Sequence, residues 1–288
     1  MLLDCPTKSA NHFDPETIPV EKVLIDDTSI AYKVFGDGDP LLMINGFSST
    51  MDTWNPPMLD LLSQSYRVVI FDSRGMGHSG SSEKPYSIPL FANDTANLMD
   101  QLGISRAHLF GYSLGGMVAQ DLALSFPERI RSLVLVSTDC GGSHAERMSA
   151  GVWETLSDKS GDLLSQAERM FSVLFPSGWL AEHDPWDYCP EIHETTPVEH
   201  IVRQSEAFFA WQGTYDRLPD IQCPALVITG TDDVIIPPGN AFILAGRIPA
   251  SWLVQIPGGG HGIAYQFPEL FSKAVLMFLG LAVLFPRS

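Results

Sequence analysis

Hydrophobic and polar positions along the chain predict short strands separated by helices. The apolar runs 23–25 and 30–35 flank a polar turn at 26–29, a pattern typical of a β-hairpin. Four further runs are apolar at almost every position, which indicates strands buried on both faces of a sheet. These runs cover residues 41–44, 68–71, 107–110 and 133–136.

Helical periodicity separates these strands. In the stretch 91–102, Leu98, Met99 and Leu102 fall on one helix face, and the stretch 117–125 repeats the pattern. The order of strand, helix and strand favours right-handed crossovers and a parallel sheet with helices on both faces. The sequence therefore predicts an α/β fold. Beyond residue 220 it adds strands at 225–229 and 252–256, a helix at 240–247 and a terminal helix over 268–284.

The alternation stops between residues 140 and 220. This stretch contains Trp153, Trp179, Trp186 and Trp211 with many Met and Phe residues, amid acidic residues at helical spacing. We expect an inserted, mostly helical subdomain at 140–220 that interrupts a core formed by residues 1–139 and 221–288. Its aromatic side chains either form the interior of the subdomain or line an apolar pocket.

Composition narrows the class of protein and the kinds of partner. The 288 residues are 45% hydrophobic and 18% charged, which allows a large core and excludes global disorder. Asp and Glu number 34 against 17 Lys and Arg, and the net charge of −17 would repel phosphate backbones and anionic lipid. Neither a nucleic acid nor a membrane is therefore expected as a partner.

Cysteine spacing and the two ends of the chain indicate a cytoplasmic protein. Cys5, Cys140, Cys189 and Cys223 are too far apart in sequence for a CxxC pair or a zinc motif, so no metal site is predicted. Residues 1–4 place an acid where a secretory signal needs basic residues. The last apolar run, 274–285, is shorter than the ~20 residues of a membrane span and indicates a buried helix. The glycines at 258–260 lack the Lys-Ser/Thr of a phosphate loop, and no cofactor is predicted.

Candidate chemistry begins with the run Gly-Tyr-Ser-Leu-Gly-Gly at 111–116. It directly follows the predicted strand 107–110 and precedes a helix, which is the context of a nucleophile elbow. Gly111 and Gly115 suit a tight turn in which Ser113 takes a strained conformation, because bulkier residues there would collide with the strand or the helix. The helix that begins here points its positive end at the site, which favours an anionic intermediate.

A serine nucleophile requires a base, and the base requires an orienting acid. Among the histidines after Ser113, only His261 follows a predicted strand on a glycine-rich loop, whereas those at 144, 183, 193 and 200 fall in the insertion. For the acid, Asp233 is favoured over Asp232, because the first aspartate suits the turn and the second points back into the site. Asp139, which follows the strand 133–136, is a third candidate.

With these motifs the chain resembles the α/β-hydrolase fold superfamily, from about residue 21 to its end. Besides the run around Ser113, the matching motifs are Asn-Gly-Phe at 45–47, Asp-Ser-Arg-Gly-Met-Gly-His-Ser at 72–79, the stretch 230–237 and the loop around His261. The order Ser, Asp, His is that of the family. The resemblance implies a mostly parallel, eight-stranded sheet with helices on both faces, and it makes the insertion a helical cap.

The resemblance also implies a role for individual residues. Ser113 would be the nucleophile, His261 the general base and Asp233 the acid that orients it. The backbone N–H groups of Phe47 and Leu114 would form the oxyanion hole.

Two of the matching motifs, at 45–47 and 72–79, lead to further expectations. The family usually has His-Gly where this chain has Asn45-Gly46. Because the donors of the hole are backbone groups, Asn45 should leave the hole intact and change only how the loop is braced. The run Asp-Ser-Arg-Gly at 72–75 is expected to be structural, with an ion pair and a tight turn behind the site. His78 is not expected to be catalytic.

Together these residues predict a serine hydrolase that cleaves small or medium carboxylic esters through an acyl-enzyme. Serine at the elbow argues against dehalogenases and epoxide hydrolases of this fold, which use aspartate there. Two alternatives stay open. One is a carbon–carbon bond hydrolase of meta-cleavage diketone acids, a branch that usually has Trp directly after the catalytic His, where this chain has Gly262. The other is a ligand receptor without catalysis.

Overall fold

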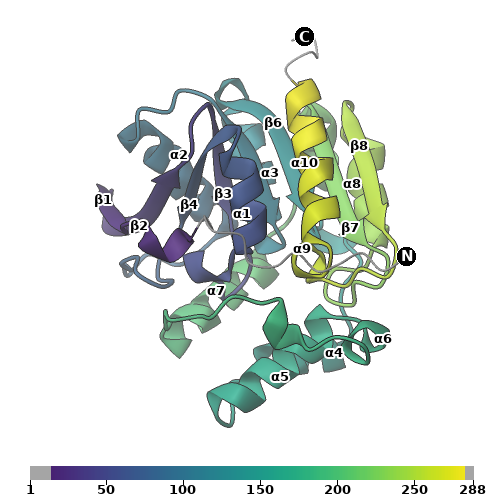
Figure 1. The fold of residues 1–288 in the computed structure, drawn as a ribbon. Coiled ribbons are helices and arrows are strands. Elements are labelled where there is room, and N and C mark those ends of the chain that lie inside the picture. Colours follow the sequence, from purple (N-terminus) through teal and green to yellow (C-terminus); the bar gives the residue numbers. More distant parts are fainter. Residues whose placement is uncertain (1–13, 283–288) are drawn as a thin grey trace.

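The computed structural model describes residues 14–282 and arranges the strands in one eight-stranded sheet. The strand order is β1-β2-β4-β3-β5-β6-β7-β8. The pairings among β3 to β8 are parallel, while β2 pairs antiparallel with both β1 and β4. Figure 1 shows helices on both sides of this sheet. The predicted fold class is confirmed.

Every predicted strand is present, and most extend beyond their apolar runs. The strands are β1 Glu21–Ile25, β2 Thr28–Phe35, β3 Asp39–Ile44, β4 Tyr66–Phe71, β5 Ala107–Tyr112, β6 Ile130–Val136, β7 Ala225–Gly230 and β8 Ser251–Ile256. The hairpin turn is tighter than predicted, because Ile25 pairs with Thr28 and leaves only Asp26 and Asp27 between the strands. Asp26 has φ +50°, a left-handed conformation that short polar side chains tolerate.

Two groups of helices cover the two faces of the sheet. Helices α1 Pro56–Ser63 and α10 Pro268–Ala282 pack together on one face, and α2 Ile88–Gln101, α3 Leu114–Ser125 and α8 Gly239–Arg247 lie on the other (Figure 1). Neighbouring strand residues alternate between the two cores: Leu41 and Met43 belong to one, Leu42 and Ile44 to the other. Covering both faces requires apolar residues at successive positions, which explains the continuous apolar runs.

The ends of the chain bear on several sequence predictions. The predicted terminal helix is present as α10 up to Ala282, and its last two positions fall outside the described residues, as do residues 1–4 and Cys5. None of the helices within residues 14–282 combines the length and apolar character needed to cross a membrane.

Short elements complete the core: η1 Pro15–Thr17, η2 Met51–Thr53, η3 Pro127–Arg129 and α9 Ile263–Gln266.

The residues between β6 and β7 form helices and turns and contain no strand. The elements are η4 Gly142–His144, α4 Ala150–Ser157, α5 Leu163–Leu174, α6 Ser177–Leu180, η5 Pro185–Asp187, α7 Val198–Ala210 and η6 Tyr215–Asp220. Figure 1 shows α4 to α7 beyond one end of the sheet, apart from the helices that cover its faces. Several hydrogen bonds tie this segment to loops that follow strands, among them Ser48 N–H to Gln204 Oε1 and Gly262 N–H to the Leu174 carbonyl. The segment therefore lies at the carboxyl edge of the sheet.

Candidate active site

Ser113 occupies the turn between β5 and α3 in a strained backbone conformation. Its φ and ψ are 54° and −120°, a combination that costs roughly 1–3 kcal/mol and persists only where the surroundings enforce it. The surroundings do so through two hydrogen bonds, from the Ser113 N–H to the Val136 carbonyl at 2.9 Å and from Thr138 Oγ1 to the Ser113 carbonyl at 2.7 Å.

The glycines around Ser113 are required by close approach. A Cβ on Gly111 would collide with the backbone of Gly115 and Gly116, and a Cβ on Gly115 would overlap the Ile44 carbonyl oxygen. The tight turn expected from the sequence is therefore present, and it brings the start of α3 against the end of β3.

Asp233 and His261 meet across the ends of β7 and β8. His261 Nδ1 lies 2.9 Å from Asp233 Oδ2, and both side chains are buried. The other carboxylate oxygen of Asp233 accepts hydrogen bonds from the N–H groups of Ile235 and Ile236 at 2.9 and 2.8 Å. The carboxylate is thus held by two backbone donors in the orientation that binds the imidazole, which leaves Nε2 of His261 for other partners.

The other two candidate acids lie elsewhere. Asp232 is exposed and accepts a hydrogen bond from Thr231 Oγ1. Asp139 is buried, but its carboxylate accepts the Gly141 N–H at 2.7 Å and lies 3.3 Å from Arg147 Nη1. Burial raises the pKa of Asp139, and the nearby Arg147 opposes that shift. In this structure only Asp233, of the three, contacts His261.

Tyr112 connects the serine turn with the histidine loop. Its ring lies edge-on to the His261 imidazole with centroids 5.6 Å apart, and its hydroxyl donates a hydrogen bond to the His261 carbonyl. Burial holds the pKa of Tyr112 well above its ordinary value, so the phenol stays a donor. Because Tyr112 directly precedes Ser113, this contact fixes the spacing between the two loops.

The loop after β3 passes over Ser113. A Cβ on Gly46 would lie 3.3 Å from Ser113 Cβ and 3.8 Å from Ser113 Oγ. Asn45 braces this loop from within: its Oδ1 accepts the Gly46 N–H at 2.8 Å, and its Nδ2 donates to the Thr50 carbonyl at 2.8 Å. The expectation that Asn45 acts through loop bracing is confirmed.

Two backbone donors near Ser113 have no partner among the residues that the structure describes. Leu114 is the first residue of α3, so its N–H has no acceptor within the helix. The Phe47 N–H likewise donates no hydrogen bond. Unpaired N–H groups beside a nucleophile are the arrangement needed to bind a negatively charged oxygen.

The Asp-Ser-Arg-Gly run after β4 is structural, but its ion pair differs from the expected one. Arg74 is wholly buried and binds Asp94 at 2.7 Å and Asp27 at 2.8 Å instead of its neighbour Asp72. Asp72 accepts the N–H groups of Met51 and His78. These contacts join three loops behind the site, and none of them reaches Ser113 or His261.

An apolar surface spans the insertion and the loops at the carboxyl edge. Its buried members are Leu156, Val173, Ile235 and Ile236, and Phe47, Met148, Val152, Trp153, Met170 and Leu174 pack against them. The set includes the residue that follows Gly46 and the residues that hold the Asp233 carboxylate. It therefore adjoins the candidate catalytic side chains.

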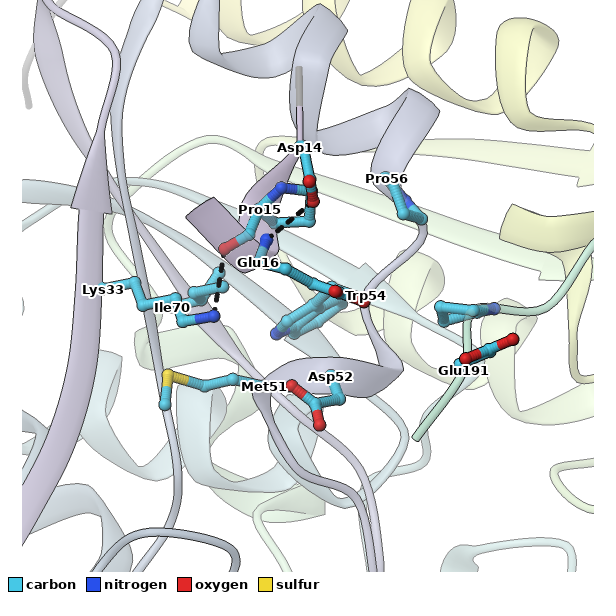
Figure 2. A pocket seen from close by; sticks show the side chains of 11 residues that line it. Asp14, Pro15, Glu16, Lys33, Met51, Asp52, Trp54, Pro56, Ile70 and Glu191 are labelled. Carbon is cyan, nitrogen blue, oxygen red and sulfur yellow. Dashed lines mark hydrogen bonds between the residues drawn. The ribbon is translucent and has the colours of Figure 1, made fainter. Parts of the chain in front are cut away.

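Other possible binding sites lie away from these residues. A cavity of about 320 Å³ lies between η1, η2 and the residues around Glu191. Figure 2 shows its lining residues, among which Lys33 Nζ donates to the Pro15 carbonyl. Ser113, Asp233 and His261 do not line it. Within residues 14–282, no three His, Cys, Asp or Glu side chains are placed to hold a metal ion.

Sequence reasoning missed Tyr112 and Gln204. Tyr112 occupies the first variable position of the GxSxG motif, so the motif gave no signal for it. Gln204 is the polar residue among the three buried residues of α7, the others being Ala207 and Phe208. A glutamine at helical spacing with apolar residues was the available signal.

The fold and this site define an α/β hydrolase. A family model described as "alpha/beta hydrolase fold" matches residues 39–170. Together with the relatives described next, it shows that the chain belongs to the α/β-hydrolase fold family, and the protein is a hydrolase of that fold.

Particular relatives narrow the comparison. The chain is 30% identical over 261 residues to "Putative carbamate hydrolase RutD" of Azorhizobium caulinodans, an alignment that covers 88% of this chain and 96% of the relative. The protein of the same name from a Caulobacter species is 32% identical, with 84% and 91% covered. Among solved structures, an esterase of Thermogutta terrifontis has a TM-score of 0.78 at 25% identity, covering 92% of this chain and 99% of its own. The enol-lactonase of Burkholderia xenovorans has a TM-score of 0.77 at 26% identity, covering 90% and 100%.

Proposed function

We propose that the protein is a serine hydrolase of small to medium carboxylic esters, with Ser113 as nucleophile, His261 as base and Asp233 as the orienting acid. The observation that carries the proposal is the buried Asp233–His261 hydrogen bond at 2.9 Å, together with the contact that Tyr112, the residue before the strained Ser113, makes with His261. Asp233 fixes the imidazole tautomer with Nδ1 protonated, so Nε2 can accept the serine proton.

The proposed reaction proceeds through an acyl-enzyme. Ser113 Oγ attacks the ester carbonyl carbon while His261 Nε2 accepts its proton. The N–H groups of Phe47 and Leu114 bind the oxygen that becomes negative, and the positive end of α3 favours that charge. Collapse of the intermediate expels the alcohol, which takes the proton from His261. Water then repeats the sequence on the acyl-enzyme and releases the acid.

Residues 140–220 form the cap of the proposed enzyme. The apolar surface contributed by Trp153, Met148 and Val173 adjoins Phe47 and the Asp233 loop, where the acyl group of a substrate would lie. Burying methylene groups there contributes to binding at about 0.8 kcal/mol each. The esterase and the enol-lactonase among similar structures act on esters, open-chain or cyclic, which supports this substrate class.

Carbamate hydrolysis is a second candidate, favoured by the relatives named carbamate hydrolases. A carbamate carbonyl would use the same nucleophile, base and oxyanion donors, so the triad does not separate the two. The apolar surface does bear on the choice, because a small polar carbamate gains little from it.

The sequence left two alternatives open, a carbon–carbon bond hydrolase and a ligand receptor without catalysis. At position 262, next to His261, a Cβ on Gly262 would collide with the Phe175 ring, so the Trp usual in carbon–carbon bond hydrolases has no room there. A receptor without catalysis would give no turnover.

The decisive experiment combines labelling and turnover. A fluorophosphonate should label Ser113, and Ser113→Ala should lower kcat for p-nitrophenyl butyrate by on the order of 10³-fold or more. Labelling of a different serine would refute the assignment. Faster turnover of a matched p-nitrophenyl carbamate than of the ester would favour the second candidate, and turnover confined to meta-cleavage diketone acids would favour carbon–carbon bond hydrolysis.

A further inference from the structure

Helix α7 carries a wholly buried glutamine, Gln204, on its inner face. Its side chain is 0% exposed, and its Oε1 accepts a hydrogen bond from the Ser48 N–H at 2.6 Å. The next inward residues of the helix, Ala207 and Phe208, belong to the main hydrophobic core. A polar side chain among such neighbours requires a specific partner, because an unpaired buried polar group is destabilising. Gln204 Nε2 has no partner among the described residues, so the Ser48 contact is the one that the side chain makes.

Helix α7 is anchored to the core by contacts that do not involve Ser48. His200 Nδ1 lies 3.1 Å from Tyr86 Oη, and the two rings stack. Arg203 donates to two carbonyls of the loop 82–84, and its guanidinium lies 3.9 Å from the centre of the Tyr86 ring. The position of Gln204 Oε1 is therefore set by how α7 docks and not by the loop that it binds.

The loop that follows β3 is fixed on both sides of one peptide group. The Gly46 N–H is held by Asn45 Oδ1, and the Ser48 N–H is held by Gln204 Oε1. Between them lies the peptide whose donor is the Phe47 N–H, which has no acceptor among the described residues. Ser48 has φ +57°, a left-handed conformation that is uncommon for serine and needs support. A free donor between two fixed peptides is preorganised for an incoming oxygen.

We propose that Gln204 is a positioning residue that completes the oxyanion hole from the cap. It acts through Ser48 to set the direction of the Phe47 N–H, and it does not itself touch the substrate. The inference rests on the proposed function, in which the Phe47 N–H is one of the two oxyanion donors. Its consequence is that the hole is complete only while α7 is docked, so the cap contributes to stabilising the transition state as well as to covering the site.

The test is Gln204→Met, which keeps the length of the side chain and removes the acceptor. We expect kcat for p-nitrophenyl butyrate, and the rate at which a fluorophosphonate modifies Ser113, to fall by on the order of 10-fold to 100-fold. That is less than the loss of an oxyanion donor itself causes. KM should change by less than about twofold, because the hole binds the transition state more strongly than the ester. Affinity for a trifluoromethyl ketone, which adds to Ser113 and forms an oxyanion, should fall by the same factor as kcat.

Two variants separate this role from a structural one. Gln204→Glu keeps an acceptor at the same reach and should recover most of the phosphonylation rate. Gln212→Met makes the same substitution at an exposed glutamine just beyond α7 and should match the wild type. Where Gln204→Met does not fold, Gln204→Asn, whose shorter side chain does not reach Ser48, should show the same loss.

The outcomes distinguish this inference from the proposed function. If the wild type is not labelled at Ser113, the proposed function fails and the role of Gln204 fails with it. If the wild type is labelled normally and Gln204→Met is labelled at the same rate, the role of Gln204 alone is wrong. If the activity of the variants falls in step with their thermal unfolding midpoints, and Gln204→Glu is no more active than Gln204→Met, the proposed role of Gln204 is also wrong.

Discussion

The carboxyl groups of Asp72 and Glu194 converge beside Gly77 in the interior of the protein. Asp72 follows β4, whereas Glu194 belongs to the segment that leads into α7, and their side chains are 0% and 4% exposed. A Cβ on Gly77 would collide with an oxygen of each, which shows how closely the two groups converge. Two buried carboxylates this close would repel each other, so we expect the pair to hold one proton in common.

Burial is the main reason why the Asp72–Glu194 pair keeps a proton. Burial and the neighbouring Glu194 raise the pKa of Asp72 to about 8, although the N–H groups of His78 and Met51 oppose the shift. Burial also raises the pKa of Glu194, assisted by Asp52 and opposed by His78 and Lys33. His78 Nε2 lies 3.0 Å from Glu194 Oε1, yet neither Glu194 oxygen accepts a hydrogen bond from a fixed donor in the described structure.

The shared proton predicts that the contribution of the Asp72–Glu194 pair to stability declines as pH rises from about 4 to 8, independently of any other titrating group. Over that range the folded protein binds a proton that the unfolded chain has released, so the free energy of unfolding decreases with pH and levels off above about 8. Glu194→Gln supplies a neutral donor to Asp72 at every pH and should remove this decline. Urea unfolding from pH 5 to 9 measures it: the variant should gain stability over the wild type as pH rises. Glu191→Gln, at an 87% exposed position of the same segment, is the control, and a constant difference between Glu194→Gln and the wild type would contradict the shared proton.

His108 predicts a second pH dependence, on the acid side. It is buried in β5 with Nδ1 2.7 Å from Ser132 Oγ, and burial lowers its pKa from 6.5 to about 4. As pH falls through this window the unfolded chain gains a proton that the folded protein does not, so stability is lost. The free energy of unfolding should decrease by roughly 3 kcal/mol in all, because each tenfold weakening of proton binding corresponds to about 1.4 kcal/mol. His108→Gln should abolish this acid-side loss in urea unfolding at pH 7 and 4.5, while His193→Gln, at an exposed position, should retain it.

The acid of the proposed triad is tested by three matched substitutions. Asp233→Asn should lower kcat by on the order of 10³-fold to 10⁴-fold, because the amide favours the wrong tautomer of His261. Asp232→Asn, at an exposed position, should change kcat by less than about twofold. Asp139→Asn removes the ion pair with Arg147 and should lower the thermal unfolding midpoint more than it lowers kcat. Equal losses of kcat at Asp139 and Asp233 would show that the acid is not assigned correctly.

Local patterns predicted the fold because each of its elements is specified by neighbouring residues. Strands covered on both faces must be apolar throughout, which made the five strands β3 to β7 visible as runs, and the glycines at 111 and 115 marked the turn that close packing enforces. The preference for Asp233 over Asp232 agrees with the observed contact to His261, because these successive residues point to different sides: Asp232 is exposed and Asp233 is buried against His261.

Contacts between distant segments were not predictable in the same way. Arg74 was expected to pair within its own motif, yet it binds Asp94 and Asp27, which become its neighbours only through the packing of α2 and the hairpin. The Asp72–Glu194 pair joins residues 122 positions apart (194 − 72), and no sequence period relates them. Such pairings depend on how the insertion docks, which hydrophobic spacing alone does not determine.

The apolar surface above the site predicts the acyl preference of the proposed esterase. Each methylene buried there should add about 0.8 kcal/mol to binding, or about fourfold per carbon, until the acyl chain extends beyond these residues. We therefore expect kcat/KM for p-nitrophenyl esters to rise from acetate to about butyrate or hexanoate and then to fall. Charged acyl groups should react poorly, because this surface does not replace their lost hydration.

The preferred length of the acyl chain should depend on Trp153. Its ring packs against Phe47 with ring centroids 5.8 Å apart and against Phe209 with centroids 4.7 Å apart. Trp153→Ala removes a large ring from the wall next to the oxyanion loop, so the preferred acyl chain should lengthen by about two carbons or more. Trp186→Ala, at a 52% exposed position of the same insertion, should leave the preference unchanged. Initial rates over the series from acetate to decanoate decide the matter. A steady fall from acetate onwards in the wild type would mean that these aromatic side chains form only the interior of the insertion and do not contact the substrate.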